Sequence, residues 1–183
     1  MIWLSNSTLA RLRDQLQQRG QRPSIAAPDV NMSPDTVELM NILAEYGPVC
    51  EAMYLMMSAD GRISNEERDV LKGALRNLSG DTIRTSHMEA MLDAAGKNVA
   101  DQGRTARMQD VVAQLHDDRA RAEVAFVLAA AIAFADNAIA DEENETLNEL
   151  AEGLGIDESR ANELLDEVEA DLRAQREAGS TAS

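Results

Sequence analysis

The sequence predicts an all-α fold, a compact bundle of about seven to nine helices with an internal pseudo-two-fold helix–loop–helix duplication. Strong helix formers such as Ala, Leu, Glu and Arg dominate the chain, while only 3% of its residues are aromatic. Apolar residues recur three and four positions apart, and no segment shows the period-two alternation of a β-strand. A short acidic segment also recurs 76 positions further along the chain, each time after an apolar stretch.

Residues 1–35 are predicted to form an N-terminal helix and a Pro-rich linker. A stripe of three leucines predicts a short helix that ends near Gly20. Three of the four prolines lie between residues 20 and 35, which is typical of an extended linker. Residues 1–30 hold four arginines against two aspartates. The segment is therefore either a mildly basic helix tethered to an acidic body or a frayed extension.

Residues 36–175 are predicted to form the helical domain, and residues 176–183 a disordered tail. Two nearly continuous apolar stretches, 48–59 and 121–135, should be the buried central helices. Gly47-Pro48 is expected to break or kink the first segment, because a proline ring clashes with the preceding helical turn. Asp157 is placed to cap the last helix. Further amphipathic helices are marked by apolar stripes that begin at Val37, Val70, Met88, Met108, Leu147 and Ala161.

The formal net charge of −16 restricts the classes of binding partner. Nucleic-acid binding needs Lys and Arg to neutralise phosphates, and an anionic membrane surface repels an acidic protein. We therefore expect neither nucleic-acid binding nor direct membrane insertion. The acidity permits cation binding or a basic protein partner, and solubility alone is the other explanation.

The sequence is typical of a cytoplasmic protein. Its one cysteine, Cys50, forms no intrachain disulfide and lies among apolar residues, which predicts a buried, inert thiol rather than a nucleophile. The N-terminus lacks the basic region and long apolar stretch of a signal peptide. The longest apolar stretch, residues 124–135, is too short to span a membrane.

The repeated segment carries the strongest signal. Residues 60–67 read Asp-Gly-Arg-Ile-Ser-Asn-Glu-Glu, and residues 136–143 read Asp-Asn-Ala-Ile-Ala-Asp-Glu-Glu. In the first copy, Ser64 and Glu67 have the spacing of a capping box at a helix start. In the second copy Ala140 stands where Ser64 would be, so its acids must satisfy the free amides and the positive end of the helix dipole.

Several familiar sites do not fit the residues. An EF-hand loop needs oxygen ligands at positions 1, 3 and 5 and Glu at 12, but counting from Asp60 places Arg62 at position 3 and Leu71 at position 12. Neither histidine has a second ligand three or four residues away, which argues against zinc. Nothing supports a Cys50–His dyad. We therefore predict no catalytic residues and no organic cofactor.

Four carboxylates at matching positions of the two copies are the candidate metal site: Asp60, Glu67, Asp136 and Glu143. If the pseudo-two-fold axis brings the loops together, these like charges repel, and a hard cation such as Ca²⁺ or Mg²⁺ would relieve the repulsion, binding weakly. Helix termination and capping, without any metal, is the alternative reading.

The two segments resemble the tellurite-resistance TerB-like family. Its hallmark is a pair of Ala-Asp-Gly-x-Ile-x-x-x-Glu segments, which stand here at 59–67 and 135–143, together with an ending similar to Leu-Ala-Glu-Gly-Leu-Gly-Ile at 150–156. The resemblance covers residues 36–172, and Asn137 departs from it where the family favours Gly.

The resemblance implies a non-enzymatic interaction module in a stress or metal (tellurite-type) resistance system. It implies protein partners, including membrane-associated and calcium-binding resistance proteins. The alternative is a metal-dependent hydrolase that uses the same four acids. An all-carboxylate cluster without histidine favours binding over catalysis.

Overall fold

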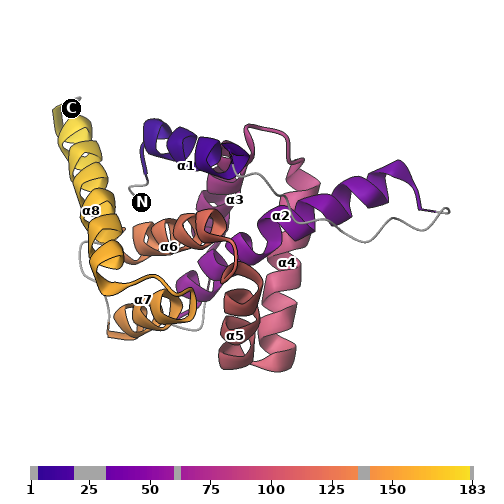
Figure 1. The fold of residues 1–183 in the computed structure, drawn as a ribbon. Helices are drawn as coiled ribbons and strands as arrows, with labels where there is room; N and C mark the ends of the chain where they lie inside the picture. The colour runs from indigo at the N-terminus through magenta and orange to yellow at the C-terminus, as the bar shows by residue number, and fades with distance from the viewer. Residues whose placement is uncertain (1–3, 19–31, 60–62, 136–140, 182–183) are drawn as a thin grey trace.

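The computed structural model describes residues 4–18, 32–59, 63–135 and 141–181, and within these ranges the chain forms eight helices and no strand (Figure 1). The predicted all-α fold class is confirmed. In chain order the helices are α1 (Asn6–Gln18), α2 (Pro34–Met57), α3 (Asn65–Ser79), α4 (Thr85–Gln102), α5 (Arg104–Leu115), α6 (Arg119–Ala133), α7 (Asp141–Gly153) and α8 (Glu158–Thr181).

The two apolar helices predicted to be central are α6 and the C-terminal half of α2, and they pack on one another more extensively than any other pair (Figure 1). Every residue of α6 from Arg121 to Ala133 is buried. Three consecutive alanines, 129–131, are fully buried, and their small side chains permit a close approach of neighbouring backbones. In the described part of the chain, no helix combines the length and apolar composition needed to cross a bilayer.

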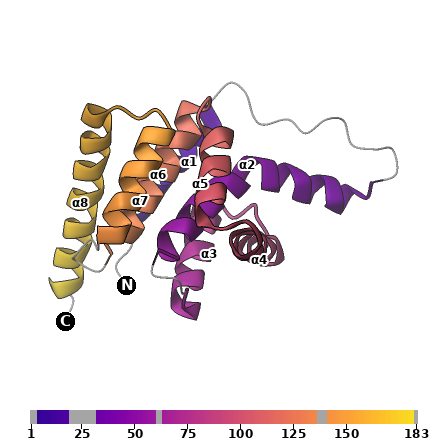
Figure 2. The same ribbon diagram turned by 90° about the horizontal axis from the view of Figure 1, so that it is seen from below.

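The other helices cover this central pair on several sides (Figure 2). Helices α4 and α5 pack on α2 and on each other, and α7 and α8 both pack on α6. Helix α1 contacts α3 and α6. Each copy of the repeat therefore consists of a buried helix, α2 or α6, and the following helix packed against it, α3 or α7.

Of the break or kink expected at Gly47-Pro48, the break does not occur, because helix α2 is continuous across these two residues. A proline inside a helix cannot donate to the carbonyl four residues earlier. The carbonyl left without its usual partner belongs to Ala44, and Nη2 of Arg121 in α6 donates to it at 2.8 Å. A side chain from the other central helix thus replaces the missing backbone hydrogen bond.

The N-terminal helix is part of the core. The leucine stripe of α1 (Leu9, Leu12 and Leu16) is at most 3% exposed and belongs to the same apolar cluster as α2 and α6. Helix α2 begins at Pro34, where Ser33 caps its first turn by accepting a hydrogen bond from the Thr36 amide. Residues 19–31 of the expected linker lie outside the described residues.

The last helix is longer than the sequence indicated, because α8 continues to Thr181 through residues expected to be a disordered tail. Good helix formers such as Ala, Gln, Arg and Glu favour the extension. A tertiary contact supports it as well: Nη2 of Arg176 donates to the Phe134 carbonyl, at the end of α6, at 3.0 Å.

Candidate functional site

The first acidic segment ends in a complete capping box. The Ser64 amide donates to Oε2 of Glu67 at 2.7 Å, and the Glu67 amide donates to Oγ of Ser64 at 3.2 Å. The predicted pairing at the start of α3 is confirmed. One oxygen of the Glu67 carboxylate is therefore engaged by the backbone, while Asp60 lies outside the described residues.

The second acidic segment leads into α7, whose first turn contains Asp141, Glu142 and Glu143. Asp136 lies outside the described residues. Across the described ranges, no three His, Cys, Asp or Glu side chains come together as they would around a metal ion. Neither Glu67 nor Glu143 therefore belongs to such a group among the described residues, and the four-carboxylate site remains a prediction.

A buried ion pair joins α2 to α5. Nε and Nη2 of Arg107 donate to the two carboxylate oxygens of Glu51 at 2.6 and 2.9 Å. Nη1 of the same guanidinium donates to Asp110 at 2.6 Å and to Gln102 at 3.1 Å. Arg107 is 8% exposed and Glu51 7% exposed. The hydrogen bonds that Arg107 donates to Glu51 raise the pKa of Arg107, so this guanidinium stays charged inside the fold.

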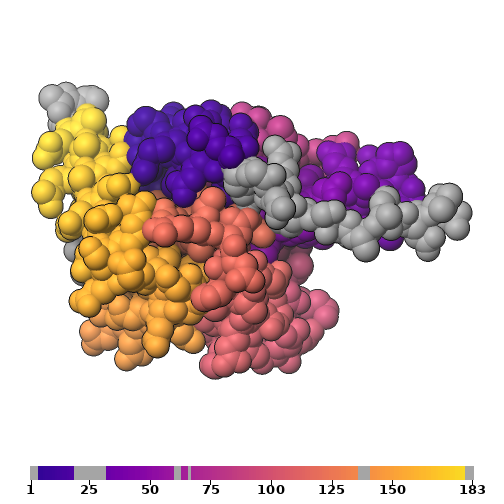
Figure 3. Space-filling view, viewed as in Figure 1, coloured from indigo at the N-terminus to yellow at the C-terminus, as the bar shows by residue number. Residues whose placement is uncertain are grey.

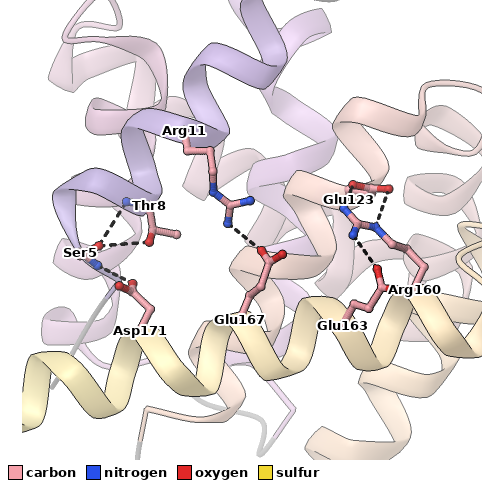
Figure 4. Close-up of polar contacts among 8 residues, drawn as sticks. All are labelled: Ser5, Thr8, Arg11, Glu123, Arg160, Glu163, Glu167 and Asp171. Carbon is pink, nitrogen blue, oxygen red and sulfur yellow. Dashed lines mark hydrogen bonds and ion pairs between the residues drawn. The ribbon is translucent and has the colours of Figure 1, made fainter.

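A second buried carboxylate, Glu123 of α6, holds the start of α8 (Figure 4). Nε and Nη2 of Arg160 donate to it at 3.1 and 2.8 Å, and Nε of Arg119 donates at 3.1 Å. Nη1 of Arg160 also donates to Glu163 at 2.9 Å. These guanidinium groups lower the pKa of Glu123, Arg160 being the larger cause. The contact therefore stabilises the fold above the usual carboxyl pKa, and this contribution is lost as pH falls through the lowered value.

Further along α8, two contacts fasten the N-terminal segment (Figure 4). The Ser5 amide donates to Oδ2 of Asp171 at 2.8 Å, and Nη2 of Arg11 donates to Oε2 of Glu167 at 2.9 Å. Both side chains of the Arg11–Glu167 pair are about half exposed, so the buried leucines of α1 supply most of the attachment.

The cysteine has the properties expected of an inert thiol. Cys50 is 1% exposed within α2, and burial raises the pKa of its thiol to about 12. A thiol with that pKa carries almost no thiolate at neutral pH, and the thiolate is the reactive form. The predicted burial of the cysteine is confirmed.

A small polar cavity lies where α5 ends and α8 begins. It has a volume of about 200 Å³, and His116, Arg119, Glu123, Gly155 and Arg160 are among its lining residues. His116 is tied to the end of α7, since its Nδ1 lies 3.0 Å from the Gly153 carbonyl oxygen. The cavity therefore lies among the ends of four helices, α5 to α8, and both of its arginines already donate to Glu123.

The buried ion pairs were not among the residues predicted from the sequence. Their partners are far apart in the chain: 56 residues separate Glu51 from Arg107, and 37 separate Glu123 from Arg160. One signal does point to them. Glu51, Arg121 and Glu123 are charged residues inside the two apolar stretches, and a charge in a buried helix requires a partner.

The comparisons with known proteins give one result. A family model described as "Tellurite resistance protein TerB" matches residues 49–166, well over half of the chain. The matched region begins in the middle of α2 and ends within α8. Neither the search of curated proteins nor the search of solved structures found a match.

Proposed function

The chain belongs to the tellurite resistance protein TerB family, and from this membership we propose that it is a cytoplasmic, non-enzymatic interaction module in a tellurite-type metal or stress resistance system. Its partners would be other proteins of such a system, including a membrane-associated one. The matched region contains both acidic segments, the whole of α6 and the C-terminal part of α2.

One observation carries the non-enzymatic part of the proposal. The buried carboxylates of the two central helices are each held by an arginine from a neighbouring helix: Glu51 by Arg107 and Glu123 by Arg160. Such pairs hold helices together, and in the second pair Arg160 lowers the pKa of Glu123. A general acid would need the opposite, a carboxyl group whose pKa is raised towards neutrality.

The alternative, a metal-dependent hydrolase, is tested by a substrate screen. The purified chain is assayed against generic phosphoesterase and esterase substrates with and without Mn²⁺, and Asp60→Ala serves as the comparison variant. We expect no turnover above the buffer rate in any condition. Turnover that requires Mn²⁺ and disappears in Asp60→Ala would contradict the non-enzymatic proposal and establish the hydrolase.

We also propose that the acidic segments bind a divalent cation weakly, Ca²⁺ or Mg²⁺, through Asp60, Glu67, Asp136 and Glu143. The matching positions of the four acids in the two copies support this proposal. The capping bond to the Ser64 amide uses one oxygen of Glu67, and a carboxylate has two with which to accept bonds or coordinate an ion. Only oxygen atoms would be offered, as Ca²⁺ and Mg²⁺ prefer.

Millimolar Ca²⁺ should raise the melting temperature of the wild-type chain. A cation present at ten times its Kd stabilises the native state by about 1.4 kcal/mol, which corresponds to roughly 3–5 °C for a chain of this size. Differential scanning fluorimetry measures the shift. The double variant Asp60→Asn with Asp136→Asn should show none, whereas the matched variant Asp117→Asn with Asp166→Asn, at exposed positions elsewhere, should keep it. An equal shift in all three proteins would mean that the acids only cap helices.

A further inference from the structure

The N-terminal half of α2 extends beyond the rest of the molecule (Figures 1 and 3). Its residues 34–46 precede the region that the family model matches. The segment is rich in apolar residues, yet none of them is fully buried, whereas the same helix is buried without interruption from Pro48 to Met53. The apolar members of the segment are Val37, Leu39, Met40, Ile42 and Leu43.

One side of this segment forms a groove with the loop between α3 and α4. The groove has a volume of about 630 Å³. Its apolar floor consists of Met32, Pro34, Val37 and Ile42. Met32 is 39% exposed, which is unusual for a methionine beside other apolar side chains. The residues of α2 that line the groove, from Pro34 to Ile42, span roughly 13 Å along the helix, enough to seat two to three turns of a second helix.

The rim of the groove is acidic. Glu38 lines the groove, and Asp35 follows the lining residue Pro34. The two carboxylates share a single cation, Arg84, whose Nη2 is 3.6 Å from Oδ1 of Asp35 and 3.1 Å from Oε2 of Glu38. All three side chains are at least 42% exposed. Two carboxylates with one guanidinium leave the rim negative, in a chain whose net charge is already −16.

This charge decides which partner fits. A second copy of the chain would bring the same acidic rim and the same net charge of −16 against the groove, and like charges across an interface oppose association. An apolar floor with an acidic rim complements a helix with an apolar stripe bordered by Lys or Arg. We propose that the groove lined by Met32, Val37, Glu38 and Ile42 is a docking site for a basic amphipathic helix of a partner protein. This inference rests on the proposed function and gives the partner its chemistry.

The probe is a fluorescently labelled 14-residue peptide with Leu on one helical face and Lys on the remaining positions; a second peptide carries Glu in place of Lys. Fluorescence anisotropy measures binding to the full chain at low and high salt. The Lys peptide should bind saturably with one-to-one stoichiometry, and more weakly as salt rises, because exposed charges are screened. The Glu peptide should not bind.

Two matched double variants locate the site on one face of α2. Met32→Gln with Val37→Gln removes apolar side chains from the groove, and Leu39→Gln with Leu43→Gln removes apolar side chains of α2 that do not line it. The pairs match in exposure, since Met32 is 39% and Leu43 37% exposed while Val37 and Leu39 are half-buried. The groove pair should weaken binding of the Lys peptide about tenfold, and the control pair by less than about twofold.

The other outcomes overturn the proposal. If no saturable binding of the Lys peptide occurs, or if both double variants bind it as the wild type does, the groove is not the site. Equal weakening by both pairs would place any binding elsewhere on α2. A dimer of the wild type that Met32→Gln with Val37→Gln dissociates, measured by sedimentation equilibrium, would make a second copy the occupant. Each of these results leaves the substrate screen unaffected, so the groove can fail while the non-enzymatic proposal stands.

Discussion

Replacing Arg107 by methionine is expected to lower the free energy of unfolding by about 3–5 kcal/mol. The substitution removes the guanidinium that donates to both oxygens of Glu51, and it leaves a carboxylate that is only 7% exposed without its counter-charge. Most of this loss of stability comes from leaving the Glu51 carboxylate buried and unpaired, and less comes from the lost attraction to Arg107. Urea unfolding followed by circular dichroism at 222 nm gives the difference in stability.

Two controls separate this explanation from a general loss of positive charge. Arg173→Met removes an arginine that is 68% exposed and 3.9 Å from Glu169, and it should cost less than about 0.5 kcal/mol. Glu51→Leu combined with Arg107→Met removes both charges and should recover most of the loss. If the double variant is as unstable as Arg107→Met alone, the lost packing between α2 and α5 is the cause, and the stranded-charge explanation is wrong.

Truncating Phe126 to alanine is expected to cost a similar amount, about 3–5 kcal/mol. Phe126 is 1% exposed in the middle of α6 and is among the largest fully buried side chains in the described part of the chain. Its removal leaves a cavity that the central helices cannot close, because both are packed on several sides. Thermal unfolding should show a matching fall in melting temperature of roughly 6–20 °C.

The other phenylalanine provides a matched comparison. Phe134 caps the end of α6 and is half-buried, with solvent on one side. Phe134→Ala removes the same atoms and should cost well under half as much as Phe126→Ala, because less area returns to water and no enclosed cavity forms. Similar losses in the two variants would mean that α6 is loosened at its end as easily as at its centre.

Features set by local sequence were predictable. The leucine stripe of α1, the two apolar helices, the capping box of Ser64 and Glu67 and the inert Cys50 all depend on residues within a few positions of one another. Helical periodicity and side-chain capping act over that range, so the sequence alone expresses them.

Features set by distant residues were not predictable in the same way. Arginines and acids are numerous in this chain, and nothing local indicates that Glu51 should meet Arg107 or that Arg11 should meet Glu167. The length of α8 was underestimated because the Arg176–Phe134 contact that supports its end joins residues 42 positions apart. The proposed groove also depends on distant residues. Thr82, in the loop between α3 and α4, lines it together with residues 32–42, and only the folded chain brings these residues together.

The bond between Arg121 and the Ala44 carbonyl has a consequence for the order in which the chain can become structured. On its own, the segment around Gly47-Pro48 lacks the hydrogen bond that would keep it helical, so a nascent or isolated α2 should consist of two separate helical pieces. The donor that joins them arrives from 77 residues further along the chain. We therefore expect α2 to become one continuous helix when α6 packs against it. The long helix would then form during tertiary assembly and would not precede it.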